Sequence, residues 1–407
     1  MNVHVSILFA SAILLVAFAI ERAGRHYRIP PVILLIAAGM LTKPLLHVAG
    51  WTLAGLDMVV PIIGTIGLVL IVLEGSLDIS LSRERLYSAR AAMWMAWLGF
   101  LACFVVLTPL IELYFAFGYF KAAVIAVPFA LISSAVAIPN SQFLPAHGRE
   151  FVVYESALSD IIGVIVFFAL VHSDGSFLGI VQGLLGGGLV SLVLSVICAI
   201  GLALILMHSR GPIRFLPLLA GLLGLYAAGK LLYLSPLIMV LLFGLTINNP
   251  LLITRVPLFE HWMSDHYDTT LNEFKAIAFE LTFAVRGFFF ILLGYWTDLG
   301  TLAMPKAWFG ALVVLFIIYL SRAALLRSFG GSLAPSLLWL APRGLITVLL
   351  YLTARMVVPV PEWVGGSVLI VVIVSALLIL VAQRRHEMPP FKAPLPAAPG
   401  APAEDSR

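Results

Sequence analysis

Long apolar segments, each ended by a short polar or Pro- and Gly-containing stretch, restrict the fold of this chain more than any other feature. Of its 407 residues, 62% are hydrophobic and only 11% are charged, and the mean hydropathy is +1.09. Soluble domains carry about 25% charged residues, whereas a helix that crosses a bilayer needs about 17 to 25 mostly apolar residues. We therefore predict an all-α polytopic membrane protein.

Division of the sequence at its polar and Pro/Gly positions predicts about thirteen transmembrane helices. These cover residues 3–20, 29–47, 58–78, 89–115, 121–143, 151–172, 176–207, 212–231, 234–249, 273–297, 305–329, 333–357 and 363–383. The first segment has no basic region before it and no Ala-x-Ala cleavage site after it, so we interpret it as a membrane helix and not as a signal peptide. Residues 384–407 are rich in Pro and Ala, and we expect a disordered cytoplasmic tail.

The basic residues indicate the orientation of these helices. With the N-terminus outside, the inner segments collect most of the Lys and Arg. The outer segments hold only Lys43, Lys121, Lys230, Lys306 and Arg355. The positive-inside rule then predicts that the C-terminus lies in the cytoplasm. We expect a plasma-membrane protein, in a bacterial inner membrane. The net charge of +4 is explained by this topology, and we expect the lipid bilayer, not nucleic acid, as its surroundings.

Weak internal similarity relates the two halves of the chain. Pro31–Gly39 resembles Pro236–Gly244, and Leu73–Asp78 resembles Leu293–Asp298. An offset of seven helices reverses the direction of the chain across the membrane, so these pairs predict inverted repeats, which are typical of secondary transporters. The alternative is chance similarity among Leu-rich helices.

The same offset pairs the fifth predicted helix with the twelfth, and each contains a helix-breaking segment at its centre. These segments are Ser133–Pro139 and Ala341–Gly344. Proline removes a helical hydrogen bond and clashes with the preceding turn, so we predict two broken helices that cross at the midplane. Their free backbone groups must face protein or a wet cavity. A simple proline kink in each helix is the alternative.

Two carboxylates, Glu155 and Asp160, fall inside the sixth predicted helix. A charge at this depth costs at least about 2.5 to 3.5 kcal/mol and usually marks an ion or proton pathway. Helix lengths place Arg322 at the depth of Glu155, so we predict a structural ion pair between them. Asp160 points about 140° away from Glu155 and has Ser156 one turn before it. We predict that Asp160 alternately binds a proton and a cation.

Three further charged residues lie at membrane depth. Arg343 and Arg286 fall near the midplane, where either one neutralises the carbonyl ends of the broken helices or Asp160 itself. Glu74, near the inner end of the third predicted helix, is either an additional ion ligand or a side chain that reaches the interface. Nucleotide and metalloprotease motifs are absent from the sequence, and the two cysteines, Cys103 and Cys198, are too isolated for a metal site. We therefore expect no cofactor and no enzymatic activity.

Several motifs resemble the monovalent cation:proton antiporter superfamily, nearer to its NhaP-type and eukaryotic sodium/proton exchanger branch. Tyr154–Asp160 resembles the family's Glu-Ser-x-x-Asn-Asp, and Leu73–Asp78 its Phe-Glu-Gly-Gly. Phe288–Gly294 is similar to its Phe-Phe-Phe-x-x-x-Gly, and Pro342–Gly344 to its Arg-Gly on the twelfth helix. The resemblance implies that Asp160 binds the Na⁺ or K⁺ ion. It also implies a homodimer with a scaffold (helices 1–3 and 7–10) and a moving core (helices 4–6 and 11–13).

Two departures from the family pattern affect the expected ion site. The family's Thr-Asp-Pro on the fifth helix is Ser133-Ser134-Ala135 here, and its Asn-Asp on the sixth is Ser159-Asp160. Serine hydroxyls coordinate hard cations as neutral oxygens, so Ser133, Ser134, Ser156 and Ser159 are candidate ligands beside Asp160 and Glu74. The Ser-Ser pair resembles the Kef branch, which is associated with potassium.

We predict a secondary transporter that exchanges a monovalent cation for a proton by alternating access. A single midplane acid favours electroneutral one-for-one exchange. The alternatives are a cation channel through the same polar core and, less favoured, an intramembrane hydrolase that lacks a base to activate a serine. The predicted loop 255–272, with His261 and His266, is either a pH sensor or a solvated connector.

Overall fold

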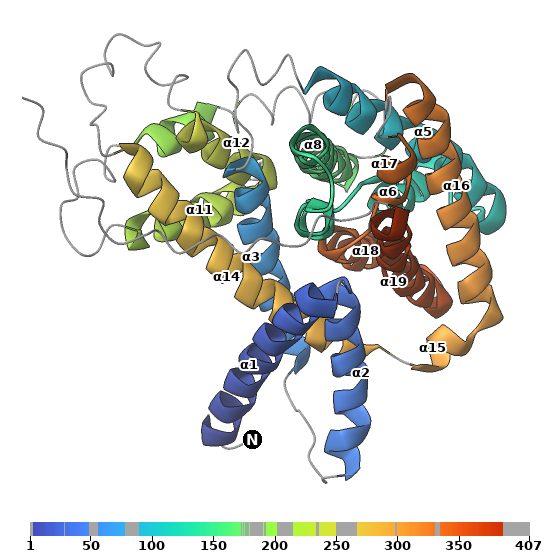
Figure 1. Cartoon of the computed structure of the whole chain (residues 1–407), viewed down its shortest axis with the longest axis horizontal. Coiled ribbons are helices and arrows are strands. Elements are labelled where there is room, and N and C mark those ends of the chain that lie inside the picture. The colour runs from blue at the N-terminus through green and yellow to red at the C-terminus, as the bar shows by residue number, and fades with distance from the viewer. Residues whose placement is uncertain are drawn as a thin grey trace, which may run out of the picture.

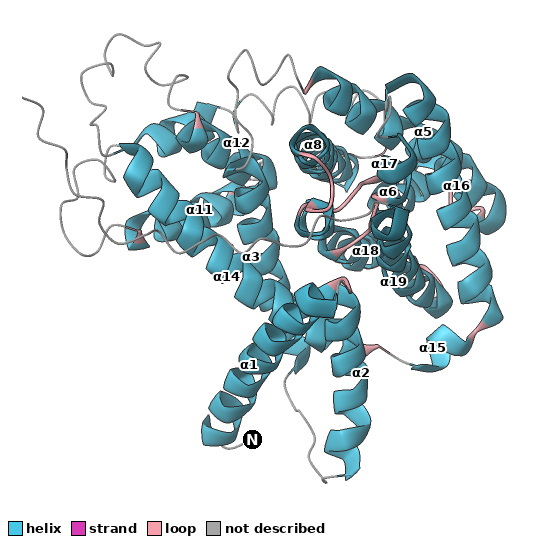
Figure 2. Ribbon diagram, viewed as in Figure 1, coloured by secondary structure: helices cyan, strands magenta, loops and turns pink. Residues whose placement is uncertain are grey.

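The computed structural model describes residues 3–27, 29–48, 56–77, 89–171, 193–201, 215–232, 236–249, 267–297, 299–329 and 334–385, with a few single residues between 173 and 190. Over these ranges the regular structure consists of helices without strands (Figure 2). By length and composition, six of the described helices are able to cross a membrane. Most of the predicted helix 176–207, both histidines of the predicted loop and the tail beyond residue 385 lie outside the described residues.

Two bundles of helices make up the described structure (Figure 1). The first bundle contains α1 (Val3–Tyr27), α2 (Pro31–Val48), α3 (Leu56–Leu77), α11 (Leu216–Leu231), α12 (Pro236–Asn248) and α14 (Tyr267–Trp296). The second bundle contains α5 (Arg90–Phe115), α6 (Tyr119–Ala130), α7 (Ser134–Ala137), η1 (Pro139–Ser141), α8 (Ala146–Val171), α16 (Pro305–Phe329), α17 (Ala334–Trp339), α18 (Leu345–Val357) and α19 (Glu362–Arg385). Short α15 (Leu299–Ala303) follows α14 and packs against α19. The helices of each bundle pack mainly against one another.

The boundary between the bundles is formed by few helices. Helices α3 and α12 of the first bundle contact α8 of the second, α3 also contacts α7 and α18, and α2 contacts α19. Helix α8 therefore stands where the two bundles meet.

Several helix bounds differ from the predicted ones, among them the end of α1, which lies at Tyr27 and not at 20. Helix α8 begins at Ala146 and not at 151, α14 begins at Tyr267 and not at 273, and α19 continues to Arg385. Hydropathy ended the predicted segments at charged residues, yet Glu, Lys and Arg are good helix formers. The first turns of α14 are amphipathic and bury Leu271 and Phe274. Residues 267–272, at the end of the predicted loop 255–272, are therefore helical.

Glycine contacts within the first bundle repeat themselves across the two halves of the chain. Gly39 of α2 packs so closely on α14 at Ile291 and Gly294 that a β-carbon would overlap the backbone there. Gly244 of α12 packs similarly closely on α3, where a β-carbon would overlap the Ser76 side chain. The predicted repeats pair α2 with α12 and α3 with α14. Each contact thus joins the first helix of one repeat to the second helix of the other, as a two-fold related pair of repeats requires.

Both predicted helix breaks are present. The fifth predicted helix divides into α6 and α7 around an extended segment at Leu131–Ser133, and the twelfth divides into α17 and α18 around 340–344. The Ser133 amide donates to the Pro342 carbonyl at 2.9 Å, and a β-carbon on Gly344 would overlap the Ser133 side chain. The two breaks therefore cross in direct contact.

Pro139 was the wrong residue to assign to the first break. It begins η1, where its missing N–H costs no helical hydrogen bond. Helix α6 ends earlier, at Ala130, because Leu131 adopts an extended conformation with φ −91° and ψ 149°. The second break does contain its predicted proline, Pro342.

Candidate ion-binding site

The amides freed by the two breaks are bound by hydroxyl and carboxylate groups. The Ile132 N–H donates to Ser159 Oγ at 2.9 Å, and the Ser134 N–H donates to Asp160 Oδ2 at 3.0 Å. On the second break, the Arg343 N–H donates to Ser375 Oγ of α19 at 2.9 Å. Buried amides must find such partners. Helix α8 thus holds the first break through two adjacent side chains.

Arginines bind the carbonyl ends of the same half-helices. Arg343 donates from Nε to the Phe129 carbonyl of α6 at 2.8 Å and from Nη1 to the Ala341 carbonyl at 3.0 Å. Arg322 donates from Nε to the Leu337 carbonyl of α17 at 2.8 Å. A cation is stabilised at the C-terminal end of a helix by the helix dipole. The Arg343 guanidinium therefore hydrogen-bonds carbonyl groups at the breaks, and its charge also interacts with that of Asp160.

Arg286 makes a weaker contact of the same kind. Its Nη1 lies 3.4 Å from the carbonyl oxygen of Ala135 in α7. This side chain comes from α14 of the first bundle, so the contact crosses the boundary between the bundles.

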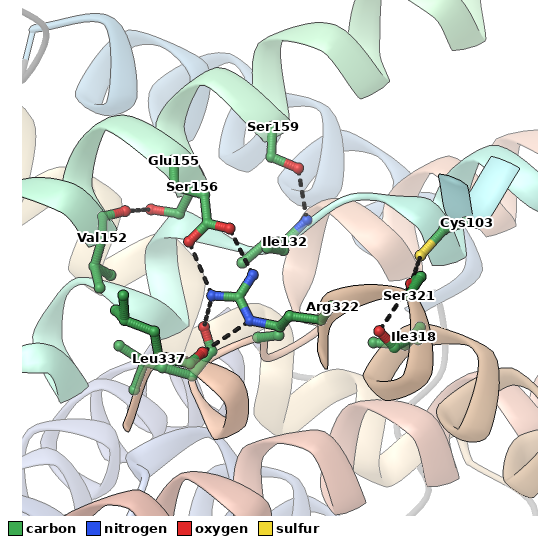
Figure 3. A network of polar contacts seen from close by, with 12 residues as sticks. Cys103, Ile132, Val152, Glu155, Ser156, Ser159, Ile318, Ser321, Arg322 and Leu337 are labelled. Carbon is green, nitrogen blue, oxygen red and sulfur yellow. Dashed lines mark hydrogen bonds and ion pairs between the residues drawn. The ribbon is translucent and has the colours of Figure 1, made fainter. Parts of the chain in front are cut away.

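Glu155 and Arg322 form a two-pronged ion pair inside the second bundle (Figure 3). Arg322 Nη1 donates to Glu155 Oε1 at 2.5 Å and Nη2 donates to Oε2 at 2.9 Å, and the side chains are 2% and 4% exposed. With Nε on the Leu337 carbonyl and a further 3.3 Å contact from Nη2 to the Leu340 carbonyl, the guanidinium has a partner on every nitrogen. Both charges are compensated inside the protein.

Asp160 is bound on one side only. Ser134 hydrogen-bonds its carboxylate through both the backbone and the side chain. The other oxygen, Oδ1, is buried and has no hydrogen-bond partner among the described residues. Asp160 is among the residues that line a cavity of about 10 Å³, close to the smallest volume that holds one water molecule. The cavity lies between the bundles and is lined by Ile71, Val72 and Gly75 of α3, Leu241 of α12, Ala157, Asp160, Ile161 and Val164 of α8, and Ile346 of α18.

The predicted serine ligands divide into two groups. Ser134 and Ser133 lie at the crossing; the Ser133 hydroxyl is buried without a partner in the described part of the chain. Ser156 donates to the Val152 carbonyl of its own helix at 2.7 Å, and Ser159 accepts the Ile132 amide (Figure 3). Ser159 also lines a separate cavity of about 20 Å³ together with Arg322 and Arg343, not the one beside Asp160.

Glu74 lies on α3, half-buried, and is not among the residues that line the cavity at Asp160. Sequence reasoning also missed two buried hydroxyls, Ser375 in α19 and Thr347 in α18. A usable signal existed for Ser375, which is a single polar residue inside the apolar run 371–380. It missed one buried charged residue as well, Glu21 of α1.

Comparisons with known proteins agree with this architecture. The family model described as "Sodium/hydrogen exchanger, transmembrane" matches residues 10–383. The structure is similar to that of the sodium proton antiporter MjNhaP1 from Methanocaldococcus jannaschii at pH 8, with a TM-score of 0.70, 19% identity, and coverage of 95% of this chain and 99% of that one. A second structure of MjNhaP1, from an electron microscopy map, gives a TM-score of 0.67 at 18% identity and covers 95% of both chains.

A search of curated protein sequences found no significant match. The family model nevertheless covers nearly all the described helices. The chain belongs to the transmembrane sodium/hydrogen exchanger family and has the all-helical fold of the antiporter MjNhaP1.

Proposed function

We propose that Asp160 is the residue at which a monovalent cation and a proton compete, and that this competition couples cation transport to proton transport. Family membership and fold support cation:proton exchange and do not favour a channel. The observation that carries the assignment to Asp160 is its unpartnered Oδ1 beside a cavity between the bundles. Since each ligand carries one positive charge to one carboxylate, exchange is one-for-one and electroneutral.

The second bundle is proposed to move as the core against the first bundle as the scaffold. The residues that α3 and α12 contribute around Asp160 are Ile71, Val72, Gly75 and Leu241, which offer no hydrogen bonds from their side chains. Apolar surfaces can move past each other without losing hydrogen bonds. The apolar residues of α3 and α12 around Asp160 are therefore compatible with alternating access. The contact of Arg286 with the Ala135 carbonyl is a polar link between the bundles that such a movement has to break.

The transported cation is proposed to be Na⁺ or K⁺. Ser134 and Ser133 supply neutral oxygens where relatives carry an acid, and fewer charges weaken the capture of a strongly hydrated ion. MjNhaP1 is a sodium proton antiporter. We further propose a homodimer in a bacterial inner membrane with the N-terminus outside, which cross-linking and cysteine accessibility at both ends of the chain would test.

Asp160→Asn is the test of this assignment. The amide keeps the shape of the side chain but holds neither a cation nor a titrating proton. We expect cation-dependent proton movement in everted vesicles to be abolished, while the protein is inserted and remains folded in detergent. The matched control is Glu362→Gln, the same change at an exposed carboxylate of α19, which should exchange like wild type. Wild-type exchange by Asp160→Asn would exclude the assignment.

Acidification gives a second test. If proton and cation compete for one carboxylate, lower pH must raise the KM for the cation and leave the maximal rate at saturating cation unchanged. Initial rates in proteoliposomes over a series of Na⁺ or K⁺ concentrations measure this. A pH effect confined to the maximal rate would contradict competition at a single site, and flux without proton counterflow would indicate a channel.

A further inference from the structure

Thr347 has an unusual environment for a threonine inside a helix. Its side chain is 0% exposed, and its hydroxyl has no hydrogen-bond partner among the described residues. Helical Thr hydroxyls usually donate to the carbonyl four residues earlier, as Thr353 of the same helix does to Leu349 at 3.0 Å. Four residues before Thr347 is Arg343, which lies in the break. The break therefore removes the ordinary partner of this hydroxyl.

The position of Thr347 on α18 lies between two features of the site. Gly344, three residues earlier, contacts Ser133 at the crossing, and Ile346, one residue earlier, lines the cavity beside Asp160. At about 100° per residue, Thr347 points about 60° from Gly344 and about 100° from Ile346. Thr347 is not itself among the residues that line the cavity, and its position on α18 falls between Ile346, which is, and Gly344, which contacts the crossing.

Three buried oxygens without a hydrogen-bond partner in the described residues belong to this region. They are Oδ1 of Asp160, Oγ of Ser133 and Oγ1 of Thr347. Most buried polar atoms in proteins have a partner, and exceptions call for an explanation. The elements that carry these oxygens, the first break, α8 and α18, contact one another, so one bound cation could be a common partner for all three.

We propose that Thr347 is a specificity-determining ligand for the transported cation. Its hydroxyl oxygen, with that of Ser133, completes the neutral half of the coordination shell, and Asp160 supplies the charge. A monovalent cation stripped of water needs several oxygens, whereas a proton needs one carboxylate oxygen. Thr347 therefore acts on cation binding and not on proton binding. This inference rests on the proposed role of Asp160.

The experiment is Thr347→Val in proteoliposomes, with Thr353→Val as the matched control in the same helix. Valine keeps the shape and removes the hydroxyl. We expect the KM for the transported cation among Na⁺, K⁺ and Li⁺ to rise about tenfold or more, the loss expected for one contact to a charged group. Exchange should persist at saturating cation, which separates this result from the complete loss expected of Asp160→Asn. Thr353→Val should keep the wild-type KM.

A purely structural role predicts a different pattern. If the hydroxyl only fills space or holds water, Thr347→Val keeps the wild-type KM for all three ions, and the proposal is wrong. Where the valine variant fails to insert, Thr347→Ser and Thr347→Ala decide. A KM near wild type for Ser and a raised KM for Ala support a ligand, and equal KM values for the two exclude it. Retained Asp160→Asn activity would instead overturn the site itself.

Discussion

The acidic side chains on the two faces of helix α8 have opposite environments. On one face Glu155 meets Arg322 in a two-pronged ion pair, and every guanidinium nitrogen has a partner. On the other face Asp160 has one oxygen bound by Ser134 and one oxygen without a partner in the described structure. The first arrangement has no capacity for another ligand, and the second does. Under the proposed function, one helix thus combines a structural charge with an exchangeable one.

Position relative to the bundles explains this difference. Glu155 faces into the second bundle, where α16 and the end of α17 supply Arg322 and the Leu337 carbonyl. Asp160 faces the boundary with α3 and α12, whose residues at the cavity are apolar. A charge buried within one rigid unit can be compensated permanently. Under the proposed mechanism the boundary between the bundles has to open, and a charge placed there is left for the ligand to compensate.

The largest predicted effect is on the face of α8 that carries Glu155. Glu155→Ala leaves the Arg322 charge buried and unpaired, which should lower the free energy of unfolding by about 3 to 5 kcal/mol. Unfolding in detergent measures it. The double variant Glu155→Ala with Arg322→Leu should recover part of the loss, since no lone charge remains. Additive losses from the two changes would show that the pair is not a unit.

The next effect concerns the carbonyl ends of the broken helices. Arg343→Met leaves the Phe129 and Ala341 carbonyls without their donors, and we expect the free energy of unfolding to fall by about 2 to 4 kcal/mol, at about 1 to 2 for each buried carbonyl. Arg343→Lys keeps the charge and should lower the free energy of unfolding by less. Equal stability of the Met variant and wild type would mean that other donors replace the guanidinium.

A smaller effect is expected at Ser159, which binds the Ile132 amide. Ser159→Ala leaves this amide unpaired and should cost about 1 to 2 kcal/mol in the same unfolding assay. Because Ser159 faces away from the cavity at Asp160, the KM for the cation should stay near wild type. A raised KM with unchanged stability would move Ser159 into the ion site.

The smallest effect is expected at Ser156, which is the control for Ser159 on the same helix. Its hydroxyl donates to the Val152 carbonyl of its own helix, so Ser156→Ala frees no distant partner. Alanine is also the better helix former. We expect a change within about 0.5 kcal/mol in stability. A large increase in KM would show instead that the Ser156 oxygen coordinates the cation.

Sequence reasoning found most of the buried charges, because a charged residue inside an apolar segment is visible without a structure. Glu155, Asp160, Arg286, Arg322 and Arg343 are all buried, and only Glu21 among the buried charged residues that the structure describes was missed. It also located both broken helices, through the repeat and the breaker residues. It placed the first break too late, because Pro139 is permitted at the start of η1 and Leu131 carries no signal for extended backbone.

The sequence by itself determined that the chain is a bundle of membrane helices, that two of them are broken, and which charges lie among them, because these properties follow from composition and spacing along the chain. Only the tertiary structure decided which backbone group each polar side chain satisfies. Ser375, Ser159 and Arg343 acquire their partners from segments distant in sequence. Among the described residues the Thr347 hydroxyl has no partner, whereas the Thr353 hydroxyl donates to the carbonyl four residues earlier. The difference arises because the residue four before Thr347 lies in the break. Hydrogen bonding between crossed helices depends on position in three dimensions, which residue types do not encode locally.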